Sequence, residues 1–437
     1  LSASLALGTG AAAQDYERVA PRLPTQPQAP LVEAPAPPIP TAQSNQPVVS
    51  ELRGLLFFAD MTHVVRDGVG VSGPGGIDVS RVPSLDDPEL TAKLAPFVGQ
   101  PLTLGDLDRI RGIVIEWQRN HRQPFVDVVV PPQNVSSGVV QLVVAQYRLG
   151  AVKVEGAKHF SPEVVERLSG FTPGEPMTLD GVQGDMDLAN QNPFLTVNAV
   201  FQPGALPGQT DVILKATDRL PWRAYVGYDN NGVRSLGLGQ IFAGVNWGNA
   251  FGAGHVLSYQ YTRAISGRMD AHSASWVAPL PWKDRLLIYG SIQNMRPNLP
   301  SIFRSRGSSA QASMRYVKFL PRDGGLSHDI QFGYDFKTTN SNLDFAGFNV
   351  FAARAEVHQF SATYDATVTD RLGQTSVQNM LFFSPGNMTA RNSTQRLAAF
   401  VPFAKADYVY DRLLVTRTTK LPGELVSITR AAVQLAS

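Results

Sequence analysis

The sequence predicts an α+β region built from two tandem repeats, followed by an all-β region that forms a transmembrane antiparallel β-barrel. Three observations lead to this prediction. The order strand, helix, helix, strand, strand occurs twice in succession between residues 52 and 215. After Pro221 helical periodicity disappears, and apolar and polar residues alternate with a period of two. The length of 437 residues exceeds what one hydrophobic core supports, so several domains are expected.

Composition narrows the class of protein. The 38 basic and 36 acidic residues give a net charge of +2, which is too balanced to indicate a nucleic-acid partner. The chain has 0 cysteines, which excludes disulfides, thiolate metal sites and cysteine nucleophiles. Beyond the N-terminus no apolar run approaches the roughly 18 residues that a membrane-spanning helix needs.

The N-terminal region predicts export followed by a tether. Residues 1–13 resemble the end of a signal-peptide core that closes on the small residues Ala11-Ala12-Ala13, so we expect cleavage after Ala13. The alternative is a disordered alanine-rich terminus. Residues 14–50 are rich in proline, which favours extended conformations and predicts a linker. A docking site for a proline-reading module is the alternative to a plain linker.

The first repeat is expected over residues 51–147. An apolar strand around residues 55–58 and a glycine-rich turn at residues 68–76 precede two helical patterns. One helix is expected near residues 87–97, and the other begins after Thr103 as N-cap. Two strands, at residues 124–130 and 139–145, complete the unit.

The second repeat is expected over residues 148–217. Its strands are predicted at residues 149–155, 194–201 and 210–215, and its helices near residues 161–169 and 179–190. Ser161 followed by Pro162 predicts the start of the first helix, and Pro193 predicts the end of the second.

Residues 218–437 are predicted to form part of a barrel. Trp222, Ala224, Val226 and Tyr228 alternate with polar or small residues, and similar runs follow to the C-terminus. One face is apolar and the other polar, which suits a wall between lipid and water. A soluble β-sandwich also alternates. About ten or eleven segments of about eight to ten residues favour the barrel.

The sequence shows no motif that indicates catalysis. Residues 68–73 fit G-x-G-x-x-G, but no helix opens after them, so a turn is expected and not a nucleotide site. Neither a G-x-S-x-G elbow nor a P-loop lysine occurs, and the histidines lack metal-ligand spacing. Asp106 and Asp108 lie on the solvated face of a predicted helix. We therefore predict no enzyme, no catalytic residue, no cofactor and no metal.

Binding is the remaining function for the repeats. A three-stranded sheet with an exposed edge offers backbone groups to an extended partner, and such pairing makes little demand on the partner's sequence. If the middle strand of each repeat is that edge, the docking strands run over residues 125–130 and 194–201. The alternative is that neighbouring domains cover these edges. The predicted docking residues are Phe125, Val126, Val128, Val130, Phe194, Val197, Val200 and Phe201.

Several short motifs, in a consistent order, resemble one known family. They are Val130-Pro131-Pro132-Gln133 after the second helix, Val139-Val140-Gln141-Leu142 leading into Val152-Lys153-Val154-Glu155-Gly156, and Asp229-Asn230-Asn231-Gly232 followed by Asn246-Trp247-Gly248-Asn249-Ala250-Phe251-Gly252. They resemble the two-partner secretion transporters (TpsB) of the ShlB/FhaC/HecB haemolysin secretion and activation type. That family combines a signal peptide, a linker, two POTRA domains and a barrel of sixteen strands.

The resemblance implies a passive channel in the outer membrane with its POTRA domains in the periplasm. It would bind an unfolded partner exoprotein of haemolysin or adhesin type and export it without nucleotide hydrolysis. It would be a monomer, with outer-membrane lipid and the barrel-assembly machinery as further partners and no nucleic acid. The alternative is a barrel-assembly insertase of the same superfamily, which usually carries more POTRA repeats. A lipase fusion needs a serine elbow, and a solute porin does not need the repeats.

Two departures from the family affect the expected completeness of the barrel. The V-R-G-Y motif is absent, and the sequence does not end on an aromatic residue. We therefore expect a C-terminally incomplete chain with an open sheet. Residues 15–20 are too short to predict the helix that plugs the pore in some family members.

Overall fold

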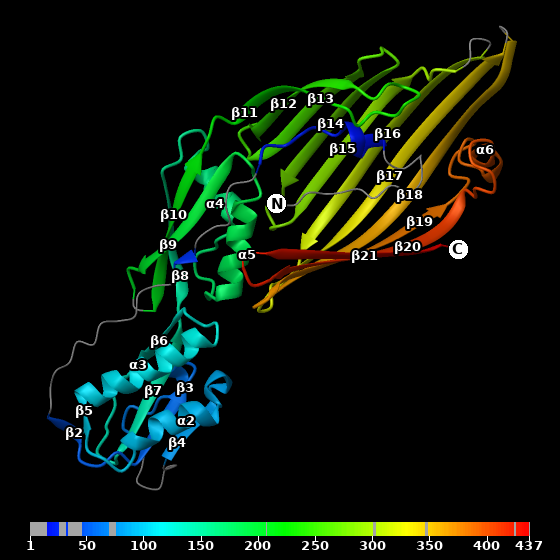
Figure 1. The fold of residues 1–437 in the computed structure, drawn as a ribbon. Helices are drawn as coiled ribbons and strands as arrows, with labels where there is room; N and C mark the ends of the chain where they lie inside the picture. The colour runs from blue at the N-terminus through cyan, green and yellow to red at the C-terminus, as the bar shows by residue number, and fades with distance from the viewer. Residues whose placement is uncertain are drawn as a thin grey trace.

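The computed structural model describes residues 15–25, 32–33, 46–69, 76–206, 208–299, 303–345, 348–423 and 425–436. The predicted signal peptide lies outside these residues, as do most of the predicted linker and residues 70–73 of the glycine-rich motif. Two α/β repeats follow one another in space and lead into one large curved sheet (Figure 1). The predicted fold class, two α/β repeats followed by an antiparallel sheet of barrel type, is confirmed.

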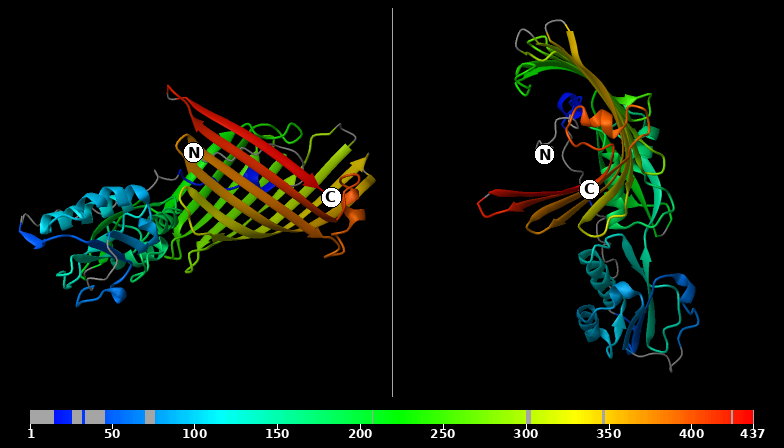
Figure 2. Two further views of the ribbon diagram at one scale, coloured as in Figure 1. Left: turned by 90° about the horizontal axis from the view of Figure 1, so that it is seen from below. Right: turned by 90° about the vertical axis from the view of Figure 1, so that its right-hand side faces the viewer.

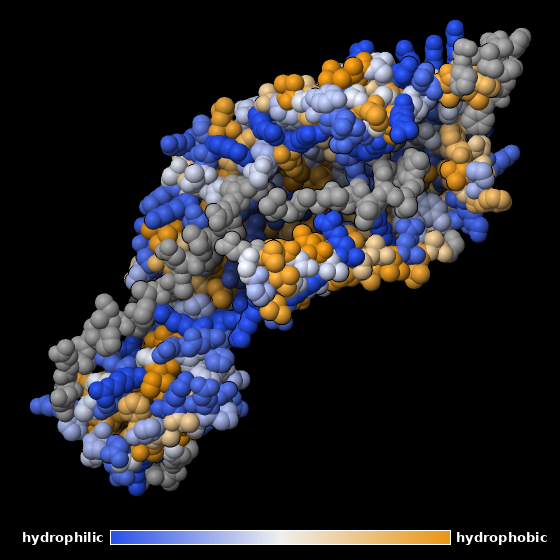
Figure 3. Space-filling view, viewed as in Figure 1, coloured by the Kyte–Doolittle hydropathy of each residue, from blue (hydrophilic) through white to orange (hydrophobic). Residues whose placement is uncertain are grey.

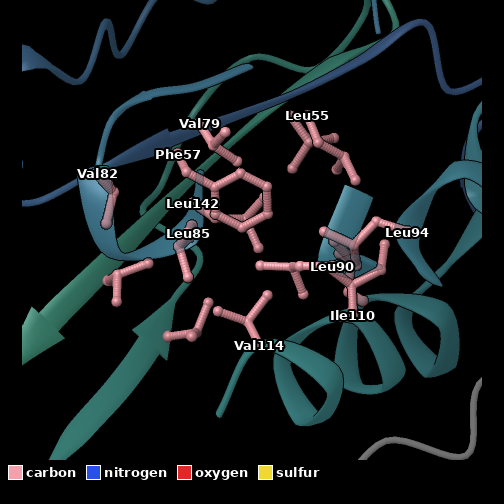
Figure 4. Packing of buried hydrophobic residues seen from close by; sticks show 14 of the residues in the cluster. Leu55, Phe57, Val79, Val82, Leu85, Leu90, Leu94, Ile110, Val114 and Leu142 are labelled. Carbon is pink, nitrogen blue, oxygen red and sulfur yellow. The ribbon is translucent and has the colours of Figure 1, made fainter. Parts of the chain in front are cut away.

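The first repeat is a four-stranded sheet with its two helices on one face. The strands lie in the order β4-β3-β7-β6, and β6 pairs with β7 in antiparallel fashion. Leucine, valine and phenylalanine side chains from the sheet and both helices fill a common core (Figure 4). The elements are β3 (Gly54–Phe58), β4 (Gly76–Arg81), α2 (Pro88–Leu94), β5 (Leu102–Thr103), α3 (Leu104–Asn120), β6 (Val126–Val129) and β7 (Val139–Gln146).

Strand β4 is an element that the sequence reasoning missed. The glycine-rich turn was expected to lead directly to a helix, but a six-residue strand begins at Gly76 and pairs in parallel with β3. Gly76 has φ +86°, which L side chains rarely adopt, so the turn ends at this glycine. Val79 is buried in the core while its neighbours Asp78 and Ser80 bond to each other outside it. The alternation is too short to stand out from a loop.

The second repeat has the predicted order of elements. Strands β8 (Arg148–Glu155), β9 (Leu195–Pro203) and β10 (Gln209–Asp218) form a sheet with β10 in the centre, covered by α4 (Pro162–Ser169) and α5 (Leu179–Ala189). A two-residue strand of the linker, β1 (Val32–Glu33), extends this sheet beyond β9. Ser161 is the N-cap residue of α4, but its side chain accepts no capping bond from a backbone N–H of the first turn.

The all-β region is one sheet of eleven antiparallel strands in sequence order (Figure 2). The strands range from 8 to 23 residues, so the longest exceed the predicted length. A strand tilted across a membrane needs about 9–11 residues, so the longest hairpin projects beyond that span. The strands are β11 (Trp222–Asp229), β12 (Gln240–Ala250), β13 (His255–Ala264), β14 (Met269–Pro279), β15 (Arg285–Met295), β16 (Phe303–Phe319), β17 (Leu326–Phe345), β18 (Phe348–Asp370), β19 (Gly373–Pro385), β20 (Asp407–Lys420) and β21 (Val426–Ala436).

The two faces of this sheet differ in polarity. On β12 the polar side chains of Gln240 and Asn246 are buried on the concave side, whereas Ile241 and Val245 are exposed on the convex side. Figure 3 shows the hollow on the concave side, with apolar side chains along the rim formed by β20 and β21. The sheet therefore has the two-sided pattern predicted from the alternation.

Two short helices lie on the concave side of the sheet. One is α1 (Asp15–Val19), which contacts β13 to β16, and the other is α6 (Thr394–Ala398), in the connection between β19 and β20 (Figure 2). Among the described residues, none of the helices is long and apolar enough to cross a membrane.

Candidate docking site

Strand β6 lies at one edge of the first sheet, and side chains bond to the backbone groups on its outer side. The Tyr147 N–H donates to the Phe125 carbonyl at 2.9 Å. In an antiparallel pair, residues alternate between bonding to the neighbouring strand and pointing away from it, so the N–H and C=O of Val128 point away from β7. Asp127 accepts the Val128 N–H at 2.8 Å, and Arg111 Nε donates to the Val128 carbonyl at 2.6 Å. Both outward groups of Val128 are therefore satisfied within the repeat.

The Arg111 side chain is itself held in place. Its guanidinium lies 3.1 Å from an Asp108 oxygen and 3.4 Å from an Asp127 oxygen. All three side chains are at most 28% exposed. An incoming strand would have to displace this ion-pair cluster, so the centre of β6 is protected against pairing.

Side chains bond to the outer backbone groups of strand β9 only near its start. The Gly204 N–H donates to the Gln209 carbonyl at 2.9 Å, which turns the backbone groups of the odd-numbered residues of β9 away from β10. At Val197 the Asn190 side chain takes both groups. Its Oδ1 accepts the N–H at 2.9 Å, and its Nδ2 donates to the carbonyl at 3.0 Å. The Asn190 amide thus replaces a neighbouring strand at Val197.

Beyond Val197 the chain's own linker pairs with the same edge. Val32 lies opposite Ala199 and Glu33 opposite Val200, in parallel orientation. The edge of β9 is therefore partly occupied by a strand from the same chain. This is pairing by backbone, since β1 adds a fourth strand to the sheet.

Amide side chains close sheet edges elsewhere in the first repeat. Gln133 accepts the Gln141 N–H at 2.8 Å and donates to its carbonyl at 2.7 Å. The buried Gln141 side chain makes the same pair of bonds with Val65, each at 2.9 Å. The glutamine of the Pro-Pro-Gln segment therefore covers the part of β7 that lies beyond the end of β6.

The predicted docking side chains lie mostly in hydrophobic cores. Val130 and Val200 are half-buried, and the other six are buried. A partner can reach these strands only through their backbone. The docking role of the two strands stays a prediction. The buried residues are Phe125, Val126, Val128, Phe194, Val197 and Phe201.

Phe125 and Phe194 join domains. Phe125 belongs to the core of the second repeat, where its ring meets Phe201 edge-on at 4.9 Å. Phe194 packs against Gly248 of β12, where an added methyl group would overlap its ring. The neighbouring Asn192 Nδ2 donates to the Gly248 carbonyl at 2.6 Å. One aromatic side chain thus fixes the first repeat to the second, and another fixes the second repeat to the large sheet.

Ion pairs surround the joint between α5 and the turns of the large sheet. Lys283 Nζ lies 2.8 Å from Asp185, and Arg322 pairs with Asp187. Arg122 of the first repeat donates to Asp180 at 2.5 Å. Burial raises the pKa of Asp185 and Asp187, and the pairing with Lys283 and Arg322 offsets only part of that effect.

The concave face carries a buried charge pair. Arg315 Nη2 donates to both oxygens of Asp335, at 2.8 and 2.9 Å, and Ser313 Oγ donates to one of them at 2.6 Å. Asp335 is 2% exposed. A buried carboxylate needs such partners, so the interior of the sheet is a hydrogen-bonded polar surface.

Comparison with known proteins agrees with this architecture. The model of the family "Haemolysin secretion/activation protein ShlB/FhaC/HecB" matches residues 208–378, and that of "POTRA domain, ShlB-type" matches residues 75–146. Over these residues the chain is similar to the ShlB/FhaC/HecB family of two-partner secretion transporters. The resemblance inferred from the motifs is confirmed.

Curated relatives match parts of the chain. The heme/hemopexin transporter protein HuxB of Haemophilus influenzae is 25% identical over 39% of this chain and 30% of its own length. The outer membrane transporter CdiB of Escherichia coli is 25% identical over 63% of this chain and 48% of its own length. The chain therefore spans less than half of the length of these relatives.

Solved structures share the fold. CdiB from Escherichia coli superposes with a TM-score of 0.69 at 16% identity, covering 93% of this chain and 71% of that one. CdiB from Acinetobacter baumannii gives a TM-score of 0.51 at 14% identity, covering 97% and 74%. At this identity the likeness concerns the fold alone.

The N-terminal segment lies against the concave face of the large sheet. The Tyr16 ring is 4.5 Å from the Tyr289 ring, and Val19 is buried, with its carbonyl accepting from Gln260 at 3.2 Å. Arg22 pairs with Asp229 at 2.6 Å. Sequence reasoning did not predict this helix, because five residues carry no periodicity. The signal that could have found it is the cluster of Tyr16, Val19 and Arg22 at the start of the predicted linker.

The convex face carries an aromatic row at the end of the sheet nearest the repeats. Trp222 and Trp247 stack at 4.7 Å, and Trp276 donates to His255 at 3.2 Å. Such side chains are typical of the boundary between lipid and water. Among the described residues, no group of three or more His, Asp and Glu is placed to hold a metal ion.

Proposed function

We propose that this chain binds an unfolded partner exoprotein at the edge of β9 and guides it along the concave wall across the outer membrane, without nucleotide hydrolysis. The partner would be an exoprotein of haemolysin or adhesin type. The two repeats would lie in the periplasm, and the large sheet would face lipid with its convex side. The names of HuxB and CdiB, a transporter of heme/hemopexin and an outer membrane transporter, support the general class.

One observation carries the proposal. The strand that pairs with β9 ends at Asp218, and the first strand of the wall begins at Trp222. A segment docked on β9 is therefore held on the repeat that leads directly into the large sheet. Asn192 and Phe194, which directly precede β9, fix that edge to β12.

The wall itself suits passage of an extended polar chain. Its concave side presents buried Gln, Asn, Ser and Thr side chains on β12 to β14, and its convex side presents Ile, Val, Leu and Tyr. An extended chain can exchange hydrogen bonds along such a surface without a specific sequence. The lipid and the barrel-assembly machinery would be the other partners, and the protein would act as a monomer.

The test is photo-crosslinking in cells that also express a candidate exoprotein of haemolysin or adhesin type. A photoreactive amino acid at Val200, on β9, should crosslink to that exoprotein. The same amino acid at Lys153, on β8 at the other edge of the sheet, is the matched control. Equal crosslinking at both positions, or normal secretion of the exoprotein after deletion of this gene, would contradict the proposal.

A further inference from the structure

The convex side chains of β17 change from apolar to polar along the strand. Between Leu326 and Phe336 every second residue is Ile, Phe or Tyr apart from one histidine, and Phe332 is exposed there. This apolar band covers about ten residues, which is about 33 Å along the strand and about 25 Å in height at a tilt of about 40°. An outer-membrane barrel has an apolar band of that height. Beyond it the same side of β17 carries Asn340 and Asn342, at the end farthest from the repeats (Figure 1).

Two arginines flank this polar end of β17. Arg306 of β16 lies opposite Asn342, and Arg354 of β18 lies opposite Asn340. Residues in register share a face of the sheet, so both arginines lie on the convex side, and both are exposed. The strand spacing of about 4.8 Å and a step of two residues put their Cβ atoms about 12 Å apart. Two extended arginine side chains can therefore meet on one headgroup.

Arg354 is directed toward the apolar band, and its charge is only partly offset. Its Nε donates to Thr338 Oγ1, one row nearer to the band, at 3.4 Å. The Glu356 carboxylate lies 4.0 Å from that Nε, but it has nearer partners in Thr389 at 2.8 Å and Arg391 at 3.3 Å. The Glu356 side chain is 9% exposed, whereas that of Arg354 is 49% exposed. The Arg354 guanidinium is therefore accessible to a further anion.

The carboxamide between the arginines is oriented as a hydrogen-bond donor. Asn340 Oδ1 accepts from the N–H and the hydroxyl of Ser308, at 2.7 and 3.0 Å. With this oxygen turned toward β16, the Asn340 NH2 group remains on the side of Arg354. An ionised phosphate accepts hydrogen bonds, and arginine forms paired bonds with it. N–H donors with excess positive charge match that chemistry.

Arg263 provides a contrast on the same face of the sheet. It is exposed at the far end of β13, but Asp270 of β14 lies directly opposite it. An opposite charge at a cross-strand position offsets the charge of the arginine. Arg306 and Arg354 instead face carboxamides on β17. We call Arg306, Asn340, Asn342 and Arg354 the basic cluster.

We propose that the basic cluster binds the phosphorylated headgroup of lipid A, the anionic lipid of the outer leaflet of the outer membrane. The acyl chains would lie on the apolar band of β17, which directly adjoins the cluster and favours a lipid over a free phosphate ion. The inference rests on the proposed function for the orientation of the sheet, with its convex side toward lipid and the repeats in the periplasm. That orientation places the cluster in the outer leaflet.

The first test is a titration of the full chain, in detergent micelles, with diphosphoryl lipid A, followed by native mass spectrometry. Arg306→Gln and Arg354→Gln should each weaken binding at least about fivefold, and the double variant should lose it, because each removes a charge-assisted contact. Arg263→Gln is the matched control and should bind as the unmodified chain does. Equal binding by all of these chains overturns the proposal.

The second test varies the headgroup and the carboxamide. Lipid A stripped of its phosphates should bind at least about tenfold more weakly, and equal binding would contradict recognition of the phosphate. Inorganic phosphate in large excess should leave lipid A bound, because it lacks acyl chains; displacement would reassign the cluster to free phosphate. Asn340→Asp still accepts from Ser308 but replaces the donor by a negative charge, so binding should fall about tenfold. Undiminished binding would exclude Asn340 from the site.

A measurement in vesicles separates this inference from the proposed function. Trp222, Trp247 and Trp276 lie on the convex side, so brominated acyl chains of phosphatidylcholine vesicles should quench their fluorescence. Absence of quenching would overturn the orientation on which both proposals rest. Quenching together with unchanged lipid A binding in the double arginine variant would overturn this inference alone, and crosslinking at Val200 would still decide the proposed function.

Discussion

The edges of the two α/β repeats differ although the repeats share one plan. In the first repeat, Arg111 and Asp127 take both outward backbone groups of Val128 in the middle of a four-residue strand. In the second repeat, Asn190 does this only at the start of a nine-residue strand, and β1 covers the next part. The difference teaches that the side chains over an edge, and not the fold, decide whether the edge strand of a repeat can pair with a further strand.

Packing between domains and pairing at an edge belong to different residues of the predicted docking strands. Phe125 and Phe194 begin the predicted docking strands, yet each ring lies in a joint between domains. The aromatic residues therefore hold the repeats in position, and only after Phe194, from Ala199 onward, does the edge backbone pair with a further strand, β1. Both joints can be tested independently of the edges.

The largest effect is expected at these joints. Phe194→Ala should lower the free energy of unfolding by about 3–5 kcal/mol, because the ring is 2% exposed and its removal leaves a cavity against Gly248. Urea unfolding of the full chain in detergent micelles measures this loss. Phe251→Ala is the control, because that side chain is 67% exposed. Similar losses from both substitutions would break the assignment of Phe194 to the joint.

The next effect concerns the closed edge of the first repeat. Arg111→Ala should lower the free energy of unfolding by about 1–2 kcal/mol, because the Val128 carbonyl loses its hydrogen-bond donor. It should also speed hydrogen exchange of the backbone amides around β6. Arg109→Ala is matched, because Arg109 lies on the same helix and pairs only at its surface with Asp106, 3.2 Å away. If both variants exchange alike, Arg111 does not close the edge, and the contrast between the repeats is lost.

A smaller, pH-dependent effect is expected at the end of β10. Burial raises the pKa of Asp218, but N–H groups of Lys158, His159 and Phe160 donate to it and leave the pKa below its ordinary 3.8. The ionised Asp218 carboxylate therefore stabilises the folded chain at pH values above the ordinary pKa, and this contribution is lost as the pH falls through the lowered pKa.

For Asp218→Asn we expect a loss of about 1 kcal/mol at neutral pH, a low figure because the carboxylate is only half-buried. The difference from the unmodified chain should shrink as the pH falls below about 4. Unfolding measured across pH 3 to 7, as an order-of-magnitude window, checks the trend. A difference that grows towards acid pH contradicts the sign.

The smallest effect is a gain in stability that leaves the edges unchanged. Gly112 lies on α3 with open space around its Cα, so Gly112→Ala should stabilise the first repeat by about 0.5–1 kcal/mol through helix propensity. Gly68→Ala should instead destabilise it, because Gly68 has φ +90° and a new Cβ would meet the Asn134 carbonyl. Thermal unfolding distinguishes the two signs, and neither change should alter exchange at Val128.

Local patterns predicted much of the fold. Thr103 forms the expected cap of α3 through a reciprocal bond pair with Asp106, and Leu107, Ile110 and Val114 face the core as their spacing indicated. Alternation after Pro221 predicted the large sheet and its polar side. Strand β4 and helix α1 were missed, because each is too short to show a period.

The closures of the edges could not be read from sequence. Asn190 and Val197 are seven positions apart, but Arg111 and Val128 are 17 apart and Gln141 and Val65 are 76 apart. Whether such side chains meet a given strand depends on the tertiary structure. The order of the elements was enough to predict that β6 and β9 lie toward the edges of their sheets. Whether side chains bond to their outer backbone groups depends on these individual contacts.

Hydrogen exchange of single amides in the full chain tests the difference between the two edges most directly. In the Glu33→Pro variant, which weakens β1, the Ala199 amide should exchange much faster than in the unmodified chain, while the Val197 and Val128 amides should keep their protection. This result would support one edge that opens and one that is closed by its own side chains. Unchanged exchange at Ala199, or loss of protection at Val128 together with Ala199, would contradict the account.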